Sequence, residues 1–188
     1  MISQAVASAL DLFWQRVADA TDKLHTEYDS EWPSVCEVGQ HWIDSYGNAQ
    51  IEWQPTQRST PSADFTKFEE ALGFELHPDI KTYYSRYWGA NVQAHAPDGD
   101  LTLLFLWNEA DLDLLIENLI GHVVACRNNK TPFAVFFAVA EPDTDYFLTV
   151  NNETGQVQLE EPGKKPLQVV AHSLAEFLNA LEPGWRGG

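Results

Sequence analysis

The sequence PFAVFFAVA, residues 132–140, is the longest apolar run in the chain and predicts a buried β-strand. The run is far shorter than the about 20 residues that a membrane-spanning helix needs. Pro-Asp at 142–143 and Asn-Asn-Glu-Thr-Gly at 151–155 are typical of tight turns between strands. We therefore expect an antiparallel meander, with strands at residues 133–140, 146–150, 156–159 and 167–170.

Apolar residues that recur at steps of three and four predict helices on both sides of these strands. The opening helix has an apolar face made of Val6, Leu10, Phe13, Trp14, Val17 and Leu24. Residues suited to begin a helix stand at Ser3, Ser62, Pro78, Asn108 and Ser173. The expected ends of the short helices are Gly73, Gly89 and Pro183-Gly184.

The remaining segments complete a mixed architecture. Residues 101–106 (LTLLFL) predict a second buried strand and residues 50–54 a short one, whereas residues 26–47 are expected to be a long irregular connection. The order of the elements favours an α+β domain whose mostly antiparallel sheet is covered by helices. At 188 residues, the chain is predicted to be a single domain over residues 1–188.

Acidic residues dominate the charge, because 28 Asp and Glu face only 11 Lys and Arg. A net charge of −17 argues against nucleic acid as a ligand and against direct binding to an anionic membrane surface. We therefore expect membrane association only through a protein partner. The N-terminus lacks the pattern of a signal peptide, and Cys36 and Cys126 are expected to be free thiols in a reducing cytoplasm.

Enzyme motifs and metal-ligand frameworks are not found in the sequence, so we expect neither a catalytic residue nor a metal or cofactor. His122 and Cys126 stand four apart and could share a helix face around zinc, but packed or surface positions are the stronger interpretation. Pairs such as Asp98 with Asp100 leave a carboxylate-dependent hydrolase as a distant alternative.

The negative charge is concentrated in three segments without Lys or Arg, namely residues 24–57, 87–126 and 131–163, each with six acids. In the second segment the acids surround a buried strand and the start of a helix, where they have no basic neighbour four residues on until the end of the helix. Trp88 and Trp107 are candidate anchors for a partner, but a core role is the stronger interpretation for each. The candidate partner-binding residues are Asp98, Asp100, Glu109, Asp111, Asp113 and Glu117.

Several short motifs carry a resemblance to a known family. They are Trp53-Gln54-Pro55, His77-Pro78, LTLL at 101–104, ENLIGH at 117–122 and AEFL at 175–178. In order and spacing they resemble the Syd family of the SUKH superfamily, from about residue 42 to residue 182. The resemblance implies an α+β protein that lies peripherally on the cytoplasmic side of the inner membrane and binds the translocon subunit SecY.

The resemblance also implies that an electronegative concave surface contacts the cytoplasmic loops of SecY and that the protein monitors or regulates SecYEG assembly. Such loops are rich in Lys and Arg, which fits the six acids as partner-binding residues. The sequence Pro97-Asp98-Gly99-Asp100 stands where the family has a Gly-Asp pair, so either aspartate can correspond to it. The alternative is a SUKH-type immunity protein whose acidic surface inhibits a basic toxin.

Overall fold

The predicted apolar run forms the central strand of a seven-stranded sheet in the computed structural model, which describes residues 2–59, 65–140, 145–161 and 164–184. This strand, β8 (Ala134–Ala140), pairs antiparallel with β7 (Gly99–Leu103) and β9 (Phe147–Asn151). The order β11-β10-β9-β8-β7-β6-β12 is completed by β6 (Val92–Ala96), β10 (Val157–Glu160), β11 (Gln168–Ala171) and β12 (Glu182–Pro183). The α+β class and the meander from β8 to β11 are confirmed.

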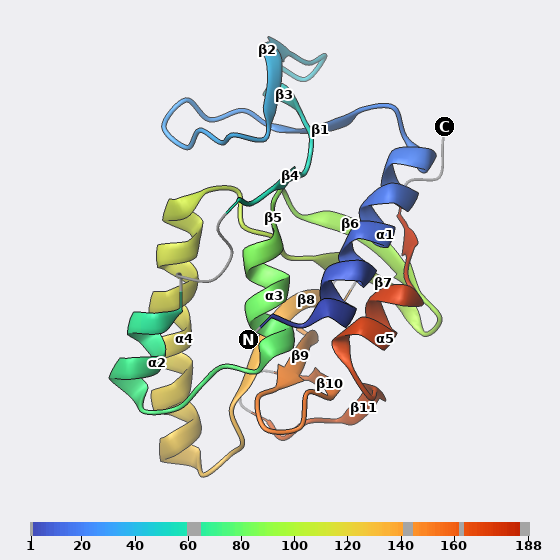
Figure 1. The fold of residues 1–188 in the computed structure, drawn as a ribbon. Helices are drawn as coiled ribbons and strands as arrows, with labels where there is room; N and C mark the ends of the chain where they lie inside the picture. Colours follow the sequence, from blue (N-terminus) through green and yellow to red (C-terminus); the bar gives the residue numbers. More distant parts are fainter. Residues whose placement is uncertain (1, 60–64, 141–144, 162–163, 185–188) are drawn as a thin grey trace.

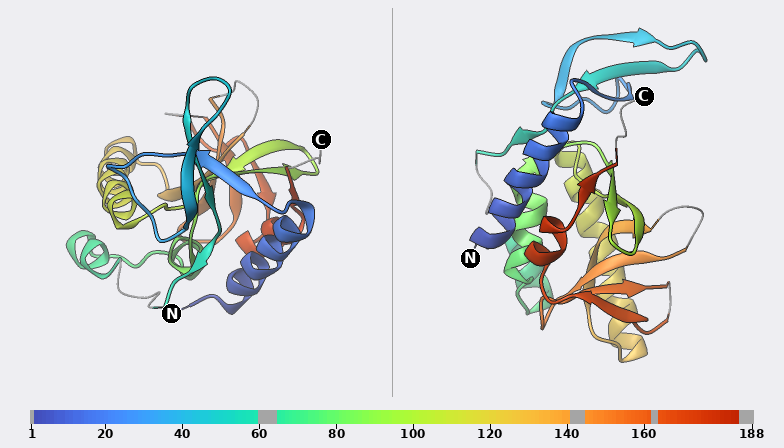
Figure 2. Two further views of the ribbon diagram at one scale, coloured as in Figure 1. Left: turned by 90° about the horizontal axis from the view of Figure 1, so that it is seen from above. Right: turned by 90° about the vertical axis from the view of Figure 1, so that its right-hand side faces the viewer.

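Helices cover the sheet, as expected (Figure 1). One of them, α1, packs against both α3 and α5 on one side of the sheet, while α4 stands along another side with α2 close to its C-terminal half (Figures 1 and 2). The bounds are α1 Gln4–Ala20, α2 Thr66–Leu72, α3 Pro78–Arg86, α4 Glu109–Asn129 and α5 Leu174–Asn179. Side chains from α1, α3, α4 and α5 meet those of the sheet in one hydrophobic core.

The contact between α3 and β8 lies at an irregularity in the central strand. The register of β8 against β9 shifts between Phe136 and Ala138. Tyr84 Oη donates to the Phe136 carbonyl over 2.6 Å, and Tyr83 Oη donates to the Phe137 carbonyl over 3.4 Å. Burial raises the pKa of both phenols well above the usual value, so they remain protonated donors inside the core.

The opening helix begins as predicted but ends earlier. Ser3 Oγ accepts a hydrogen bond from the Val6 amide over 3.5 Å and caps α1. The helix stops at Ala20, so Leu24 does not lie on its face and instead begins β1 (Leu24–Glu27). Leu24 is nevertheless buried, because the strand returns it to the same core.

The expectation of an irregular connection over residues 26–47 is wrong. A second, three-stranded antiparallel sheet, ordered β1-β3-β2, includes β2 (Glu37–Ile43) and β3 (Ala49–Trp53) and stands at one end of the molecule (Figure 1). Six of the seven residues of β2 are exposed, and a register shift between Val38 and Trp42 interrupts its pairing. The strand therefore lacks the apolar alternation by which strands are recognised in a sequence.

Smaller differences lie at the ends of other elements. The strand expected over 101–106 ends at Leu103, and Tyr87 leaves α3 to form β5 (Tyr87–Trp88), which pairs with β4 (Thr56–Gln57). Gly73 ends α2 in the left-handed conformation, as expected, whereas Ser62 lies outside the described residues. Neither β6 nor the two-residue β12 is predicted from the sequence.

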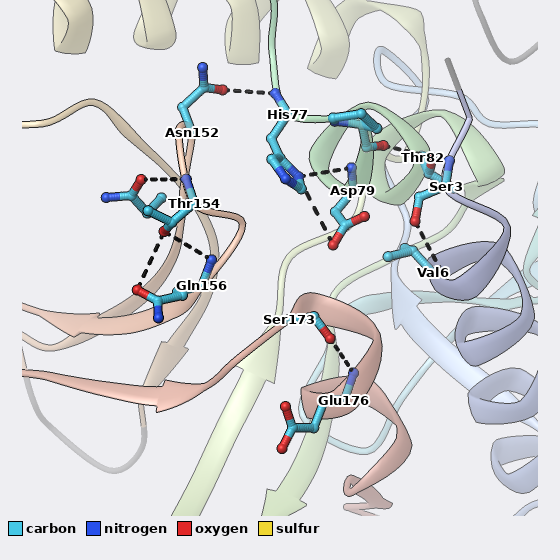
Figure 3. A network of polar contacts seen from close by, with 12 residues as sticks. Ser3, Val6, His77, Asp79, Thr82, Asn152, Thr154, Gln156, Ser173 and Glu176 are labelled. Carbon is cyan, nitrogen blue, oxygen red and sulfur yellow. Dashed lines mark hydrogen bonds and ion pairs between the residues drawn. The ribbon is translucent and has the colours of Figure 1, made fainter.

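The turn between β9 and β10 is joined to the start of α3 (Figure 3). Asn152 Oδ1 accepts from the His77 amide over 2.8 Å, and His77 Nδ1 accepts from the Asp79 amide over 3.3 Å, so that His77 caps α3. Gly155 lies against the His77 ring with φ +72°. The predicted Asn-Asn-Glu-Thr-Gly turn therefore positions a helix as well as two strands.

Candidate functional site

The six acids predicted to bind a partner lie in two separate places. Asp98 and Asp100 are exposed on the hairpin between β6 and β7. That hairpin and α4 lie on opposite sides of the molecule (Figures 1 and 2). The structure brings together only the other four, which lie in the first half of α4: Glu109, Asp111, Asp113 and Glu117.

The loop after β1 is attached to the start of α4 by side-chain hydrogen bonds. Trp32 Nε1 donates to Asp111 Oδ1 over 2.9 Å, and the Trp107 amide donates to Asp111 Oδ2 over 2.8 Å. Trp107 Nε1 in turn donates to the Trp32 carbonyl over 3.0 Å. Asn108, the cap of α4, donates from Nδ2 to the Pro33 carbonyl over 2.9 Å. These bonds place the first base-free segment beside the second.

An acidic groove with a volume of about 590 Å³ lies at this junction. Its carboxylates come from Glu27 and Asp29 on one side and from Asp111 on the other. The described residues that line the groove include no Lys or Arg. The sequence pattern gives no role to Glu27 and Asp29, although both belong to a base-free segment, because it predicts an irregular connection over residues 26–47.

An aromatic pocket of about 330 Å³ adjoins the acidic groove and shares Trp107 with it. Trp88, Val35 and Glu109 also line this pocket, and the side chain of Val35 is 70% exposed. Both tryptophans are partly buried against the core, and the guanidinium of Arg58 lies 3.8 Å from the ring centroid of Trp88. Trp88 and Trp107 therefore have a core role and also border a surface pocket beside an exposed carboxylate.

A second concave site lies beneath the β6–β7 hairpin and has a volume of about 450 Å³. Its floor is mostly apolar, and Asp98, Asp100 and Glu176 supply carboxylates. Asp100 Oδ1 lies 2.5 Å from His95 Nδ1, and Glu176 Oε2 accepts from the His172 amide over 3.0 Å. We call this site the hairpin pocket. The sequence marked Asp98 and Asp100 but not Glu176, whose motif gave no sign that α5 borders a pocket.

Comparison with known proteins agrees with the motifs. A model of the family described as Syd protein (SUKH-2) matches residues 3–183. The chain belongs to the Syd family. Among its relatives named Protein Syd, that of Pseudoalteromonas atlantica is 37% identical over 187 residues, covering 97% of this chain and 98% of the relative. That of Colwellia psychrerythraea is 34% identical, covering 96% and 92%, and that of Alteromonas mediterranea is 40% identical, covering 85% of each.

The third base-free segment of this Syd-family chain supplies no described carboxylate to either concave site, although its residues Ala140, Tyr146, Leu148 and Leu159 line the hairpin pocket. Glu160 is buried and accepts from Thr149 Oγ1 over 2.7 Å, and Glu161 forms an ion pair of 2.7 Å with Lys164. Within residues 131–163, Glu141 and Asp143 lie outside the described residues. The groove therefore combines the first two segments only.

Other candidate chemistry in the Syd-family chain is limited. His122 Nε2 and Cys126 Sγ lie 3.6 Å apart, but the described residues contain no group of three or more potential metal ligands. Both cysteines are free and buried, and burial raises the pKa of the Cys36 thiol. In the described part of the chain, none of the helices combines the length and apolar character that crossing a bilayer requires.

Proposed function

We propose that this protein binds the basic cytoplasmic loops of SecY. In this proposal it is a noncatalytic, peripheral protein on the cytoplasmic side of the inner membrane, and it monitors or regulates SecYEG assembly. Membership of the Syd family supports the proposal, because the motifs that mark the family here also imply SecY as the partner. The observation that carries it is the junction at Trp32 and Asp111, where two base-free segments meet in a concave surface.

Charge complementarity supplies the physical reason. Loops of membrane proteins on the cytoplasmic side are enriched in Lys and Arg, and the acidic groove presents carboxylates to them. Each exposed ion pair contributes only about 0–1 kcal/mol, and screening limits its reach to about 8 Å in cells. The carboxylates therefore steer and orient the loops, and an apolar anchor must add affinity.

The aromatic pocket is the proposed place for that anchor. It adjoins the groove through Trp107, and Glu109 stands at its edge. A loop whose basic side chains reach Glu27 and Glu109 could place an apolar side chain between these two carboxylates, against Trp88 and Trp107. Asp98 and Asp100, the other predicted residues, are proposed to form a second contact at the hairpin pocket.

The test is binding to membrane vesicles with overproduced SecYEG, compared with vesicles from cells at the ordinary level. We expect retention to follow the SecYEG level, and Glu27→Lys combined with Glu109→Lys to weaken it about tenfold or more. The matched control is Glu153→Lys combined with Asp19→Lys, two exposed residues that line neither the groove nor the aromatic pocket and that together make the same change in charge. The proposal would be disproved if the amount of protein retained on the vesicles changed neither with the SecYEG level nor with Glu27→Lys combined with Glu109→Lys.

The hairpin pocket needs its own arm of the experiment. Asp98→Lys changes an exposed residue of the β6–β7 turn without altering the Asp100 contact with His95. If both groups of acids contact SecY, this variant also weakens retention, by a factor smaller than the double reversal. If only the acidic groove does, Asp98→Lys behaves like Glu153→Lys, and the assignment of Asp98 and Asp100 is withdrawn.

A further inference from the structure

Helix α4 carries apolar side chains on two opposite sides. One side faces the core through residues that include Leu115 and Leu119, which are buried. The other side leaves Leu114 48%, Ile120 41% and Val124 50% exposed. An isolated exposed apolar residue is ordinary, but Ile120 and Val124 stand four apart and share a face that the described part of the chain leaves exposed, while Leu114 lies further around the helix.

A single stripe runs along this outer side. Glu109, Asp113, Glu117, Ile120 and Val124 follow one another at steps of four, four, three and four residues, so they lie in one row on the helix. The first three are exposed acids and the last two are exposed β-branched residues. From end to end the row is about 22 Å long at 1.5 Å per residue.

Gly121 lies beside this stripe, and no contact within the described chain requires a glycine at this position. It stands inside α4, where glycine weakens a helix relative to alanine. A Cβ added to it would meet no described atom within 4 Å apart from the adjacent backbone of its own helix. The position is exposed, so the missing side chain leaves a shallow notch in the outer surface between Glu117 and Val124. Small residues of this kind allow the backbone of a second helix to approach closely.

The charge on the helix indicates what covers it. Between residues 109 and 126 the helix has four acids and no Lys or Arg. Arg127, the first base, donates from Nη2 to the Leu72 carbonyl over 2.9 Å and so is directed toward α2. A segment that lies along α4 would therefore meet carboxylates over one half of the row and apolar side chains over the other.

We propose that the outer face of α4 docks a helical segment of the protein partner that has basic residues at one end and apolar residues at the other. The inference rests on the proposed function. It extends that function because Glu109 both lines the aromatic pocket and begins the stripe, so the two surfaces are continuous. A helix is the expected occupant, since the surface is a convex ridge with a notch rather than a groove that could enclose an extended chain.

The deciding variant is Gly121→Leu, measured in the same SecYEG vesicle assay. The new side chain points to open space and replaces a poor helix former, so the melting temperature should stay the same or rise. The bulk should nevertheless block a docked helix and weaken binding about tenfold. Gly121→Ala is the matched control for helix propensity, because it adds only one methyl group, and it should lose less affinity than Gly121→Leu.

A second pair of variants tests the apolar half. Ile120→Gln combined with Val124→Gln should also weaken binding, whereas Leu12→Gln should not, although Leu12 on α1 is 54% exposed. If Gly121→Leu and the Ile120→Gln, Val124→Gln double variant bind like the wild type while Glu27→Lys alone weakens binding, the docking face is disproved and the proposed function stands. If the wild type does not distinguish the two kinds of vesicle, both proposals fall.

Discussion

The indole of Trp32 donates a hydrogen bond to the carboxylate of Asp111 over 2.9 Å and joins two acidic segments that are far apart in the sequence. The other oxygen of Asp111 accepts from the Trp107 amide, so both oxygens have a protein donor. Asp111 therefore builds the wall of the acidic groove, whereas Glu109 and Asp113, its exposed neighbours on α4, remain available to a partner. The four acids grouped on α4 thus differ in role.

Asp111→Ala should lower the free energy of unfolding by about 1–3 kcal/mol, because it leaves the amide of Trp107 and the indole of Trp32 without their acceptor. Asp113→Ala, at an exposed position one turn from the start of α4, should change it by less than about 0.5 kcal/mol. Urea unfolding of the two variants measures the difference. Equal effects would contradict the structural role given to Asp111.

The sequence predicts the elements that bury an apolar face. Where the prediction is wrong, the error has a physical cause. The run at 132–140 and the caps Ser3, Asn108 and Ser173 identify β8, α1, α4 and α5 because these signals are local. The strand β2 was not predicted, because most of its side chains are exposed and it lacks an apolar pattern. The candidate site could not be predicted because it is formed by tertiary contacts. The hydrogen bond from Trp32 to Asp111, for example, links residues that are 79 apart in the sequence. Charge counting could therefore find the acidic segments but not which of them meet.

Gly155→Ala should be more destabilising than Gly73→Ala, although both glycines have nearly the same positive φ, +72° and +74°. Each substitution carries the backbone cost of a left-handed alanine, about 1 kcal/mol. At Gly155 the new Cβ would also lie 2.6 Å from His77 Nε2, whereas at Gly73 no described atom lies within 4 Å. We expect an additional loss of about 1–2 kcal/mol at Gly155, measured by urea unfolding. Equal losses would mean that His77 moves aside freely.

The ion pair between Asp11 and Arg86 predicts a pH-dependent contribution to stability. Partial burial raises the pKa of Asp11, but hydrogen bonds from Arg86 and Tyr87 outweigh it and hold this pKa below the ordinary value of 3.8. A carboxyl group with a lowered pKa stabilises the fold fully above its ordinary pKa, and this contribution is lost as the pH falls through the folded-state value. The side chain of Asp11 is 43% exposed, so solvent screening keeps the effect modest.

Asp11→Asn should therefore be less stable than the wild type at about pH 7, and the gap should narrow at about pH 2.5. Asp19→Asn on the same helix is the control, since an amide oxygen can still accept the bond from Gln15. The measurement is the urea midpoint across this pH range. A gap that stays constant down to the lowest pH would show that the ionised carboxylate of Asp11 is not its cause.

Binding kinetics should separate the acidic groove from the aromatic pocket. Long-range attraction acts before contact, so removing a groove carboxylate by Glu27→Gln should lower the association rate constant and flatten its dependence on salt. Val35→Asn removes apolar surface from the aromatic pocket without changing charge. It should leave the association rate constant within about a factor of two and raise the dissociation rate constant severalfold, because short-range packing acts only in the formed complex.

Surface-bound SecYEG in detergent or nanodiscs, with this protein in solution at several ionic strengths, provides the two rate constants separately. Glu153→Gln and Ser45→Asn serve as controls, since both change exposed residues away from the two surfaces. If Glu27→Gln acted only on dissociation, the carboxylate would be a contact in the complex rather than part of a steering field. If Val35→Asn acted only on association, the aromatic pocket would not hold the anchor, and affinity would have to come from the outer face of α4 or from the hairpin pocket.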